Sequence, residues 1–179
     1  MMTKTELAQR IYTTSHLTGQ FRLRSGVLSR EYFDKYQFEA DPVLLWEVAV
    51  AMRPLIPQDI DALAGLELGG IPLVTLLAQV TGLPALFVRK APKDYGTCRL
   101  AEGGDVAHQR LVIVEDVVTS GGQILMSARA LRALGAHIVR VVCVIDREAG
   151  GGSALAAEGL ELVPMFRMGE LQRATHAQA

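Results

Sequence analysis

The segment LVIVEDVVTSGGQ, residues 111–123, decides how the rest of the chain is interpreted. It opens with four apolar residues, as in a strand that is buried on both faces of a sheet. Two acidic residues follow, Glu115 and Asp116, and then the run Thr119-Ser120-Gly121-Gly122. The pattern predicts a buried strand that delivers two carboxylates to its end, followed by a glycine-rich loop at the start of a helix.

The loop in this segment is suited to an anion. Glycines allow backbone N–H groups to approach a ligand, and a helix N-terminus adds partial positive charge. The hydroxyls of Thr119 and Ser120 add donors, so the loop fits one phosphate monoester. Glu115 and Asp116 would repel phosphate and suit sugar hydroxyls or a metal ion instead. The segment therefore favours a sugar phosphate, the alternative being a plain strand, turn and helix cap with a solvated acidic pair.

Strands and helices alternate through the chain from residue 60 onward. Short apolar runs predict strands over 60–68, 85–88, 111–115 and 139–145. Apolar residues on one face predict helices over 71–80 and 120–134. Continuous apolar strands between amphipathic helices are typical of a parallel sheet that is covered on both faces. We therefore expect the α/β class, with helices on both faces of a parallel sheet.

The first part of the chain does not follow this alternation. Thr3 and Glu6 have the spacing of a capping box and predict a short amphipathic helix. Residues 20–36 mix basic and aromatic side chains around a turn signal, which predicts a hairpin. Asp41 followed by Pro42 predicts the start of another helix, with proline at its first position.

The sequence predicts one domain over residues 1–179, because we find no internal repeat and no linker. Its N-terminal appendage is expected over about 1–40 and its core over about 41–165. Residues 89–110 are polar, contain glycine and show little periodicity. Loops of this length are often functional or mobile, so a mobile loop is expected there.

Composition excludes several classes of protein. Half of the 179 residues are apolar and the formal net charge is −1, which gives no general reason to bind nucleic acid or an acidic membrane. Cys98 and Cys143 form no CxxC pair, so neither a disulfide framework nor a zinc site is expected. The start lacks the apolar core of a signal peptide, and no run of about 18 apolar residues occurs. We therefore expect a cytoplasmic protein without a membrane span.

Four segments occur in the order that is found in one known family. They are FRLRSGVLSREYFD (21–34), RKAPKDYG (89–96), VIVEDVVTSGG (112–122) and VIDREAGG (144–151). The third resembles the phosphoribosyl-pyrophosphate signature of type I phosphoribosyltransferases. The other three resemble the N-terminal hood, the mobile loop and the orotate-carboxylate site of the orotate branch of that family. The resemblance covers roughly residues 20–151.

This resemblance implies the type I phosphoribosyltransferase fold with an N-terminal hood. It also implies a reaction: the phosphoribosyl group of 5-phosphoribosyl 1-pyrophosphate (PRPP) is transferred to orotate, giving orotidine 5′-monophosphate and pyrophosphate in pyrimidine (UMP) biosynthesis. Mg²⁺ would be held by PRPP rather than directly by protein, with Glu115 or Asp116 reaching it through water. A homodimer is implied, in which loop 89–110 reaches the neighbouring site.

The matching positions carry the implied roles. The implied catalytic residues are Glu115, Asp116, Lys93 and Arg24. The residues implied for orotate are Thr119, Arg147 and Arg24. The residues implied for PRPP are Arg89, Lys90, Lys93, Tyr95, Gly69, Gly70, Glu115, Asp116, Val117, Val118, Thr119, Ser120, Gly121, Gly122 and Gln123.

Three of these positions depart from the usual family pattern. Arg24 stands where many members have lysine, which keeps the charge but changes the geometry. Tyr95 stands where many have histidine, and it cannot carry positive charge. Gly69 stands where many have lysine, so a side-chain cation on the pyrophosphate is lost there. Backbone amides of Gly69 and Gly70 are expected to bind the pyrophosphate instead.

Two other functions remain open at this stage. One is a phosphoribosyltransferase for another base, and Arg147 argues against it because purines and uracil have no carboxylate for an arginine to hold. The other is a regulator of the same fold that senses PRPP. The roughly 18 residues before the hood are too few for a helix-turn-helix, and the net charge is not basic.

Overall fold

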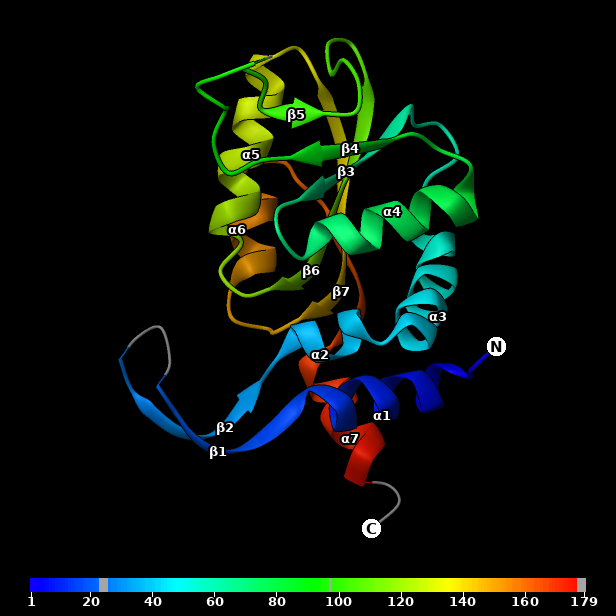
Figure 1. Cartoon of the computed structure of the whole chain (residues 1–179), viewed down its shortest axis with the longest axis vertical. Coiled ribbons are helices and arrows are strands. Elements are labelled where there is room, and N and C mark those ends of the chain that lie inside the picture. Colours follow the sequence, from blue (N-terminus) through cyan, green and yellow to red (C-terminus); the bar gives the residue numbers. More distant parts are fainter. Residues whose placement is uncertain (23–25, 97, 177–179) are drawn as a thin grey trace.

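A six-stranded sheet lies at the centre of the computed structural model, which describes residues 1–22, 26–96 and 98–176 (Figure 1). Its strands are β3 (Ala62–Leu66), β4 (Ala85–Val88), β5 (Ala101–Glu102), β6 (Arg110–Val118), β7 (His137–Asp146) and β8 (Leu162–Arg167). They lie in the order β5-β4-β3-β6-β7-β8. Every neighbouring pair is parallel except β4 and β5. The predicted parallel sheet is therefore confirmed, with one short antiparallel strand at its edge.

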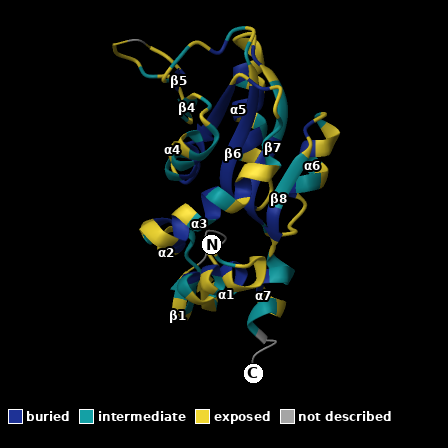
Figure 2. Ribbon diagram, turned by 90° about the vertical axis from the view of Figure 1, so that its right-hand side faces the viewer, coloured by how far each residue is buried: buried dark blue, intermediate teal, exposed yellow. Residues whose placement is uncertain are grey.

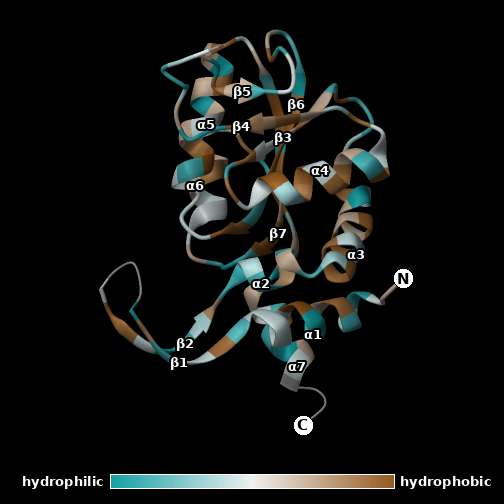
Figure 3. Ribbon diagram, in the orientation of Figure 1, coloured by the Kyte–Doolittle hydropathy of each residue, from teal (hydrophilic) through white to brown (hydrophobic). Residues whose placement is uncertain are grey.

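Helices cover both faces of the sheet, as predicted. One face carries α3 (Pro42–Met52) and α4 (Gly70–Thr81), and the other carries α5 (Gly122–Ala133) and α6 (Gly151–Ala157). Alternate residues of β6 enter the two separate cores: Val112 and Val114 pack on the α3–α4 side, while Ile113 packs on the α5–α6 side. Consequently β6 is apolar and buried along most of its length (Figures 2 and 3). In the described ranges, no helix combines the length and the apolar character that crossing a membrane requires.

The strands that lead to the site differ in length from the prediction. β3 is shorter than 60–68, because the chain leaves the sheet after Leu66 and turns toward α4. β6 continues beyond Glu115, since its ladder with β7 extends to the pair Val118 and Asp146. Glu115 and Asp116 therefore lie within the strand, where sheet hydrogen bonds fix their backbone, and α5 begins at Gly122 rather than Ser120.

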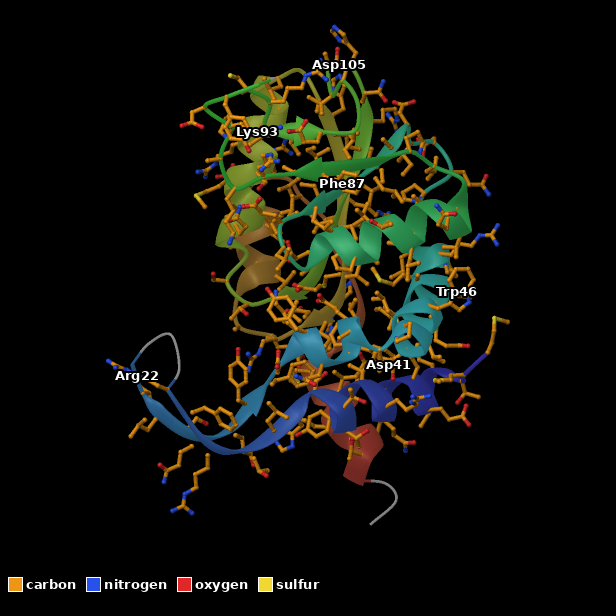
Figure 4. The ribbon with its side chains drawn as sticks, in the orientation of Figure 1. Arg22, Asp41, Trp46, Phe87, Lys93 and Asp105 are labelled. Atoms are coloured by element: carbon orange, nitrogen blue, oxygen red, sulfur yellow. The ribbon has the colours of Figure 1, made fainter. Side chains whose placement is uncertain are left out.

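The N-terminal segment forms α1 (Lys4–Ser15), the antiparallel hairpin of β1 (His16–Arg22) and β2 (Leu28–Phe33), and α2 (Lys35–Ala40). The predicted capping box is present, because Thr3 and Glu6 cap each other's backbone. The hairpin is confirmed and projects away from the body of the molecule, with Arg22 near its far end (Figures 1 and 4). Helix α2 was not predicted. It begins at Asp34, whose carboxylate accepts the N–H of Tyr36 at 3.2 Å.

The last helix, α7 (Met168–His176), packs against the first. The side-chain amide of Gln9 on α1 donates to the backbone oxygen of Ala174 at 2.8 Å. Leu7, Ile11 and Leu171 belong to the same buried cluster as α3 and α4. Both ends of the chain thus cover one end of the sheet, and a 3-10 turn, η1 (Arg53–Leu55), follows α3.

The order of the strands determines where a ligand can bind. After β3 the chain adds β4 on one side, and it then crosses to place β6 on the other side of β3. Such a switch point leaves a crevice at the carboxyl ends of the two strands, and ligands of open α/β sheets bind there. The segments that follow these ends are residues 67–70 and 119–122.

We predict that Phe38→Ala lowers the free energy of unfolding by about 3–5 kcal/mol, the range for truncating a buried aromatic side chain. Phe38 is fully buried and attaches α2 to the α3–α4 core. Urea denaturation of both proteins measures the loss. The matched control is Tyr36→Ala on the same helix, where the ring is 45% exposed and little stability should be lost. Equal losses for the two variants would contradict this view of α2.

Candidate active site

A cavity of about 430 Å³ opens at the switch point. One side is formed by the end of β6 and the residues that follow it, from Val117 to Ile124, and the other by Glu67 and Leu68 after β3. Glu115, Lys90, Lys35 and Tyr36 complete the lining. The structure therefore brings the predicted glycine-rich loop and Glu115 to one cavity, together with Lys35 from α2, which was not predicted. Asp116 is fully buried and does not line this cavity.

The glycine-rich loop has room for an anion. Gly121 adopts a φ of +75°, which favours glycine, and it starts α5. A Cβ at Gly122 would have only the Ser120 hydroxyl within 4 Å, at 3.8 Å, so the space beside the loop is open. On the opposite side the loop packs tightly, because a Cβ at Gly151 would lie 2.5 Å from the backbone oxygen of Thr119. The loop is thus held from behind and open in front, as a phosphate site requires.

A cluster of charged side chains lies beside this loop. Asp116 is fully buried and Glu115 is 9% exposed. The ammonium of Lys35 pairs with Oδ2 of Asp116. Glu39, one helical turn beyond Lys35 on α2, is also buried and interacts with Asp116. The N-terminal segment therefore supplies a base and an acid to the acidic pair of β6.

The four groups do not all carry charge. Burial and the Asp116 carboxylate raise the pKa of Glu39 to about 9. Burial, again with Asp116, raises the pKa of Glu115 well above its ordinary value. Burial would also raise the pKa of Asp116, but hydrogen bonds to Glu115 and the charge of Lys35 outweigh burial and lower it. Burial thus favours the protonated forms of Glu39 and Glu115, while Lys35 favours the ionised form of Asp116.

A second cavity, of about 660 Å³, lies between the hairpin and the end of β7. It shares Thr119 and Ser120 with the first cavity and also contains Arg147, Tyr32 and Phe33. The backbone N–H of Arg147 donates to the oxygen of Val118 at 2.9 Å, which attaches its segment to the end of β6. The predicted base-binding residues Thr119 and Arg147 therefore line one cavity under the hairpin. Arg24 lies outside the described residues.

Arg147 is available to bind an anion in this cavity. The neighbouring Asp146 accepts the backbone N–H of Glu148 at 2.9 Å, so its carboxylate is engaged elsewhere. Within the described ranges of the chain, no ion pair involves Arg147. The alternative of a surface ion pair between Asp146 and Arg147 is therefore not what the structure shows.

The loop that follows β4 is only partly brought to the site. Lys90 lines the first cavity, but Lys93 pairs with Glu102 on β5, and its ammonium lies 5.6 Å from the ring centre of Tyr95. The guanidinium of Arg89 lies 3.4 Å from the same carboxylate of Glu102. Figure 4 shows Lys93 on the β5 side of the molecule, away from the hairpin. Three predicted PRPP residues of this loop are therefore held outside their own chain's cavity.

The extent of this loop also differs from the prediction. Within 89–110, residues Ala101 and Glu102 pair with β4, and Arg110 already belongs to β6. Leu100, Ala101 and Val106 are buried in the α5–α6 core. The second half of the segment is therefore fixed by packing, and mobility of the residues before Leu100 stays a prediction.

The two glycines before α4 are positions of close backbone approach. A Cβ at Gly70 would lie 2.4 Å from the backbone oxygen of Val114, and one at Gly69 would lie 1.5 Å from Oδ2 of Asp116. Glycine at these positions lets the turn after β3 lie directly against β6. Binding of pyrophosphate by their backbone amides stays a prediction.

We predict that Glu39→Gln raises the free energy of unfolding at pH 8 by about 1 kcal/mol or more, and by much less at pH 5. Since the pKa of Glu39 rises from 4.5 to about 9 on folding, its contribution to stability is complete below pH 4.5 and is lost as the pH approaches 9. Glutamine keeps a donor toward Asp116 and cannot ionise. Denaturation curves of both proteins between pH 5 and pH 9 measure the effect. A difference that is independent of pH would mean that Glu39 is ionised in the folded protein.

Comparison with known proteins agrees with this geometry. The phosphoribosyl transferase domain profile matches residues 47–157. An orotate phosphoribosyltransferase from a Nocardioides species is 53% identical over 173 residues, which cover 97% of each chain. The crystal structure of Mycobacterium tuberculosis orotate phosphoribosyltransferase superposes with a TM-score of 0.85 at 32% identity, over 94% of this chain and 98% of that one.

The same M. tuberculosis enzyme has been crystallised with 5-phospho-α-D-ribosyl 1-diphosphate. That complex matches with a TM-score of 0.81 at 29% identity, over 94% of this chain and 98% of that one. The phosphate loop, the buried acids and the hairpin described above thus occur within a likeness that extends over nearly the whole chain. The chain belongs to the phosphoribosyltransferase family, and within it to the orotate phosphoribosyltransferases.

Proposed function

We propose that this enzyme transfers the phosphoribosyl group of PRPP to orotate, releasing orotidine 5′-monophosphate and pyrophosphate in the synthesis of pyrimidine nucleotides. The observation that carries this proposal is the pair of cavities that meet at Thr119 and Ser120. One contains a phosphate loop and buried acids, and the other contains Arg147 beneath the hairpin. With the ribose at the junction, the phosphate groups of PRPP would lie in the first cavity and the base in the second.

In this reaction the bond between C1 of the ribose and the pyrophosphate oxygen breaks, and a bond forms between C1 and N1 of orotate, which releases its N1 proton. Positive charge develops on the ribose ring and negative charge on the leaving group. Glu115 lines the cavity and the buried Asp116 follows it on β6, so the two side chains would accept hydrogen bonds from the ribose hydroxyls and stabilise the ring charge. Burial raises the pKa of Glu115, and in its protonated form the hydroxyl of this side chain can donate to a sugar oxygen.

Recognition of orotate falls to Arg147 and the hairpin. The planar guanidinium of Arg147 matches the C6 carboxylate of orotate in a bidentate pair. Tyr32 and Phe33 line the same cavity and offer aromatic surface to the pyrimidine ring. Thr119 lies at the junction and would contact the base as well as the phosphate side.

We propose Mg²⁺ as the cofactor, bound together with the pyrophosphate of PRPP. In the part of the chain that the structure describes, no three His, Cys, Asp or Glu side chains converge as metal ligands. Carboxylate oxygens are nevertheless the donors that Mg²⁺ prefers, and Glu115 or Asp116 in its ionised form would reach the ion through water. When bound, the ion would neutralise charge on the leaving pyrophosphate.

We further propose a cytoplasmic homodimer in which the loop after β4 serves the neighbouring site. Arg89, Lys93 and Tyr95 lie outside their own chain's cavity, which supports a role for them at the neighbouring site. Apolar surface is available for the contact, because Val43 and Trp46 on α3 are 57% and 46% exposed. Figure 4 shows Trp46 on the outer side of α3. Exposed apolar surface of this kind supports a protein interface.

The direct test of the reaction is the loss of orotate absorbance when the enzyme is mixed with PRPP and Mg²⁺. Parallel reactions contain uracil, hypoxanthine or adenine in place of orotate. Turnover of orotate, and of none of the other three bases, supports the proposal. Turnover of another base without orotate would replace it with a different phosphoribosyltransferase, and no turnover of any base would indicate a binding protein.

We predict that Arg147→Ala weakens orotate binding by about 1.5–3 kcal/mol, the range for a hydrogen bond to a charged group. The affinity for PRPP should change much less, because its phosphates lie on the other side of the junction. Both ligands are titrated separately by calorimetry into wild type and variant. Equal losses would indicate a general structural role for Arg147, and an unchanged orotate affinity would remove the main argument for this base.

A mixing experiment tests the shared site. Lys93→Ala and Asp116→Asn should each lower kcat/KM at least about tenfold. Lys93→Ala removes a cation that stabilises the leaving group, and Asp116→Asn removes the anion beneath the ribose. After subunit exchange, the mixture of the two variants should regain activity, because a hybrid dimer contains one site with both residues intact. Exchange is verified with a mass-tagged subunit. Absence of recovery in verified hybrids would contradict a loop that crosses between subunits.

A further inference from the structure

We propose that Lys35, at the start of α2, is a binding residue for the pyrophosphate of PRPP. Its ammonium pairs with Asp116 in this structure and would contact the diphosphate oxygens of bound substrate. This inference rests on the proposed reaction and adds a residue that lies outside the four segments that resemble the family. Its first observation is the position of Lys35, which lines the cavity at the switch point although it belongs to the N-terminal segment.

The cavity has two ends, and Lys35 belongs to the end opposite the phosphate loop. The 5-phosphate of the substrate would occupy residues 119–122, which start α5. The segment after β3, with Glu67 and Leu68, lines the other end. Lys35 contacts Oδ2 of Asp116, and a Cβ at Gly69 would lie 1.5 Å from the same atom. The ammonium therefore lies beside Gly69, at the end where a second phosphorylated group of the substrate must fit.

Position 69 itself cannot supply a cation in this arrangement. Any side chain there would overlap the carboxylate of Asp116, so the turn after β3 contributes backbone only. Lys35 and Lys90 are the two cations among the residues that line the cavity. A diphosphate carries several negative charges and would lie close to the ionised Asp116. Without Lys35, the charge of the buried Asp116 would be unscreened next to an anionic ligand at that end of the cavity.

Lys35 can exchange Asp116 for the diphosphate as its partner. In this structure the ammonium compensates the buried Asp116 carboxylate, which would otherwise carry a large desolvation cost. When ribose hydroxyls donate to Asp116, that carboxylate gains other partners. The ammonium can then turn toward the diphosphate, because its side chain is only partly buried, at 31% exposed. The charge of Lys35 thus serves the same site in both states.

The fold holds Lys35 in place for this role. Asp34 caps the helix through the N–H of Tyr36, and Phe38 fixes α2 in the core. Lys35 and Glu39 are four residues apart, so both side chains extend from one face of α2 toward Asp116. Since the backbone of Lys35 is fixed, only its side chain has to move when substrate binds.

The test is the binding of two probes, inorganic pyrophosphate and ribose 5-phosphate, each titrated with Mg²⁺ by calorimetry. Lys35→Ala should weaken pyrophosphate at least about tenfold and ribose 5-phosphate much less, while Lys35→Arg should retain most of the affinity for pyrophosphate. The control is Lys4→Ala, which removes an exposed lysine of α1 that pairs with Glu170 far from the cavity. That variant should bind both probes as wild type does.

A second background separates binding from charge compensation. Lys35→Ala alone leaves Asp116 buried without its partner, so its effect could come from a disturbed fold. In Asp116→Asn protein the carboxylate that pairs with Lys35 is gone, and adding Lys35→Ala should still weaken pyrophosphate about tenfold. Unchanged pyrophosphate affinity in that background, or equal losses for both probes, would overturn the assignment. Wild-type protein that turns over no base, or binds no pyrophosphate, would instead overturn the proposed function.

Discussion

The site depends on keeping one carboxylate, Asp116, ionised at a position of β6 that is fully buried. Water cannot solvate the charge there. The structure meets this demand with the ammonium of Lys35 and with two acids, Glu39 and Glu115, whose pKa values are raised by burial. A buried charge is tolerated only when it is paired and hydrogen-bonded. The position of α2, and hence of the whole N-terminal segment, follows from that requirement.

Close packing around the same carboxylate explains the glycines. β3 and β6 are neighbours, and the turn that follows β3 must pass directly over Asp116 to reach α4. Only residues without a side chain fit at 69 and 70, because a Cβ would overlap Asp116 or the backbone of Val114. The switch point of the sheet therefore provides backbone at one end of the cavity and a glycine-rich loop at the other. The cations come from helices and loops around it.

The sequence predicted the parts of the site that are contiguous in the chain. The strand, the two acids and the glycine-rich loop lie within 111–123, where periodicity and turn chemistry can be read directly. Arg147 was predicted because it follows a strand and matches a known motif. Lys35 and Glu39 were missed, since their spacing alone describes a solvated helix face and only tertiary packing brings them to Asp116. The protonation of Glu115 was missed for the same reason, because it depends on burial. The two-residue strand β5 is too short to produce a pattern.

The loop after β4 is restrained only weakly by its ion pairs. Lys93 and Arg89 share the carboxylate of Glu102, whose pKa is lowered first by the hydrogen bond from Lys93. Ion pairs near the surface contribute little to stability, because water and salt screen them and ordering long side chains costs entropy. A diphosphate with its concentrated charge can therefore compete with Glu102 for these side chains. By contrast, Asp116 is fully buried, so Lys35 cannot leave it without leaving an anion uncompensated. The cations that share the accessible Glu102 can thus leave their partner before substrate arrives, whereas Lys35 must wait until substrate replaces it.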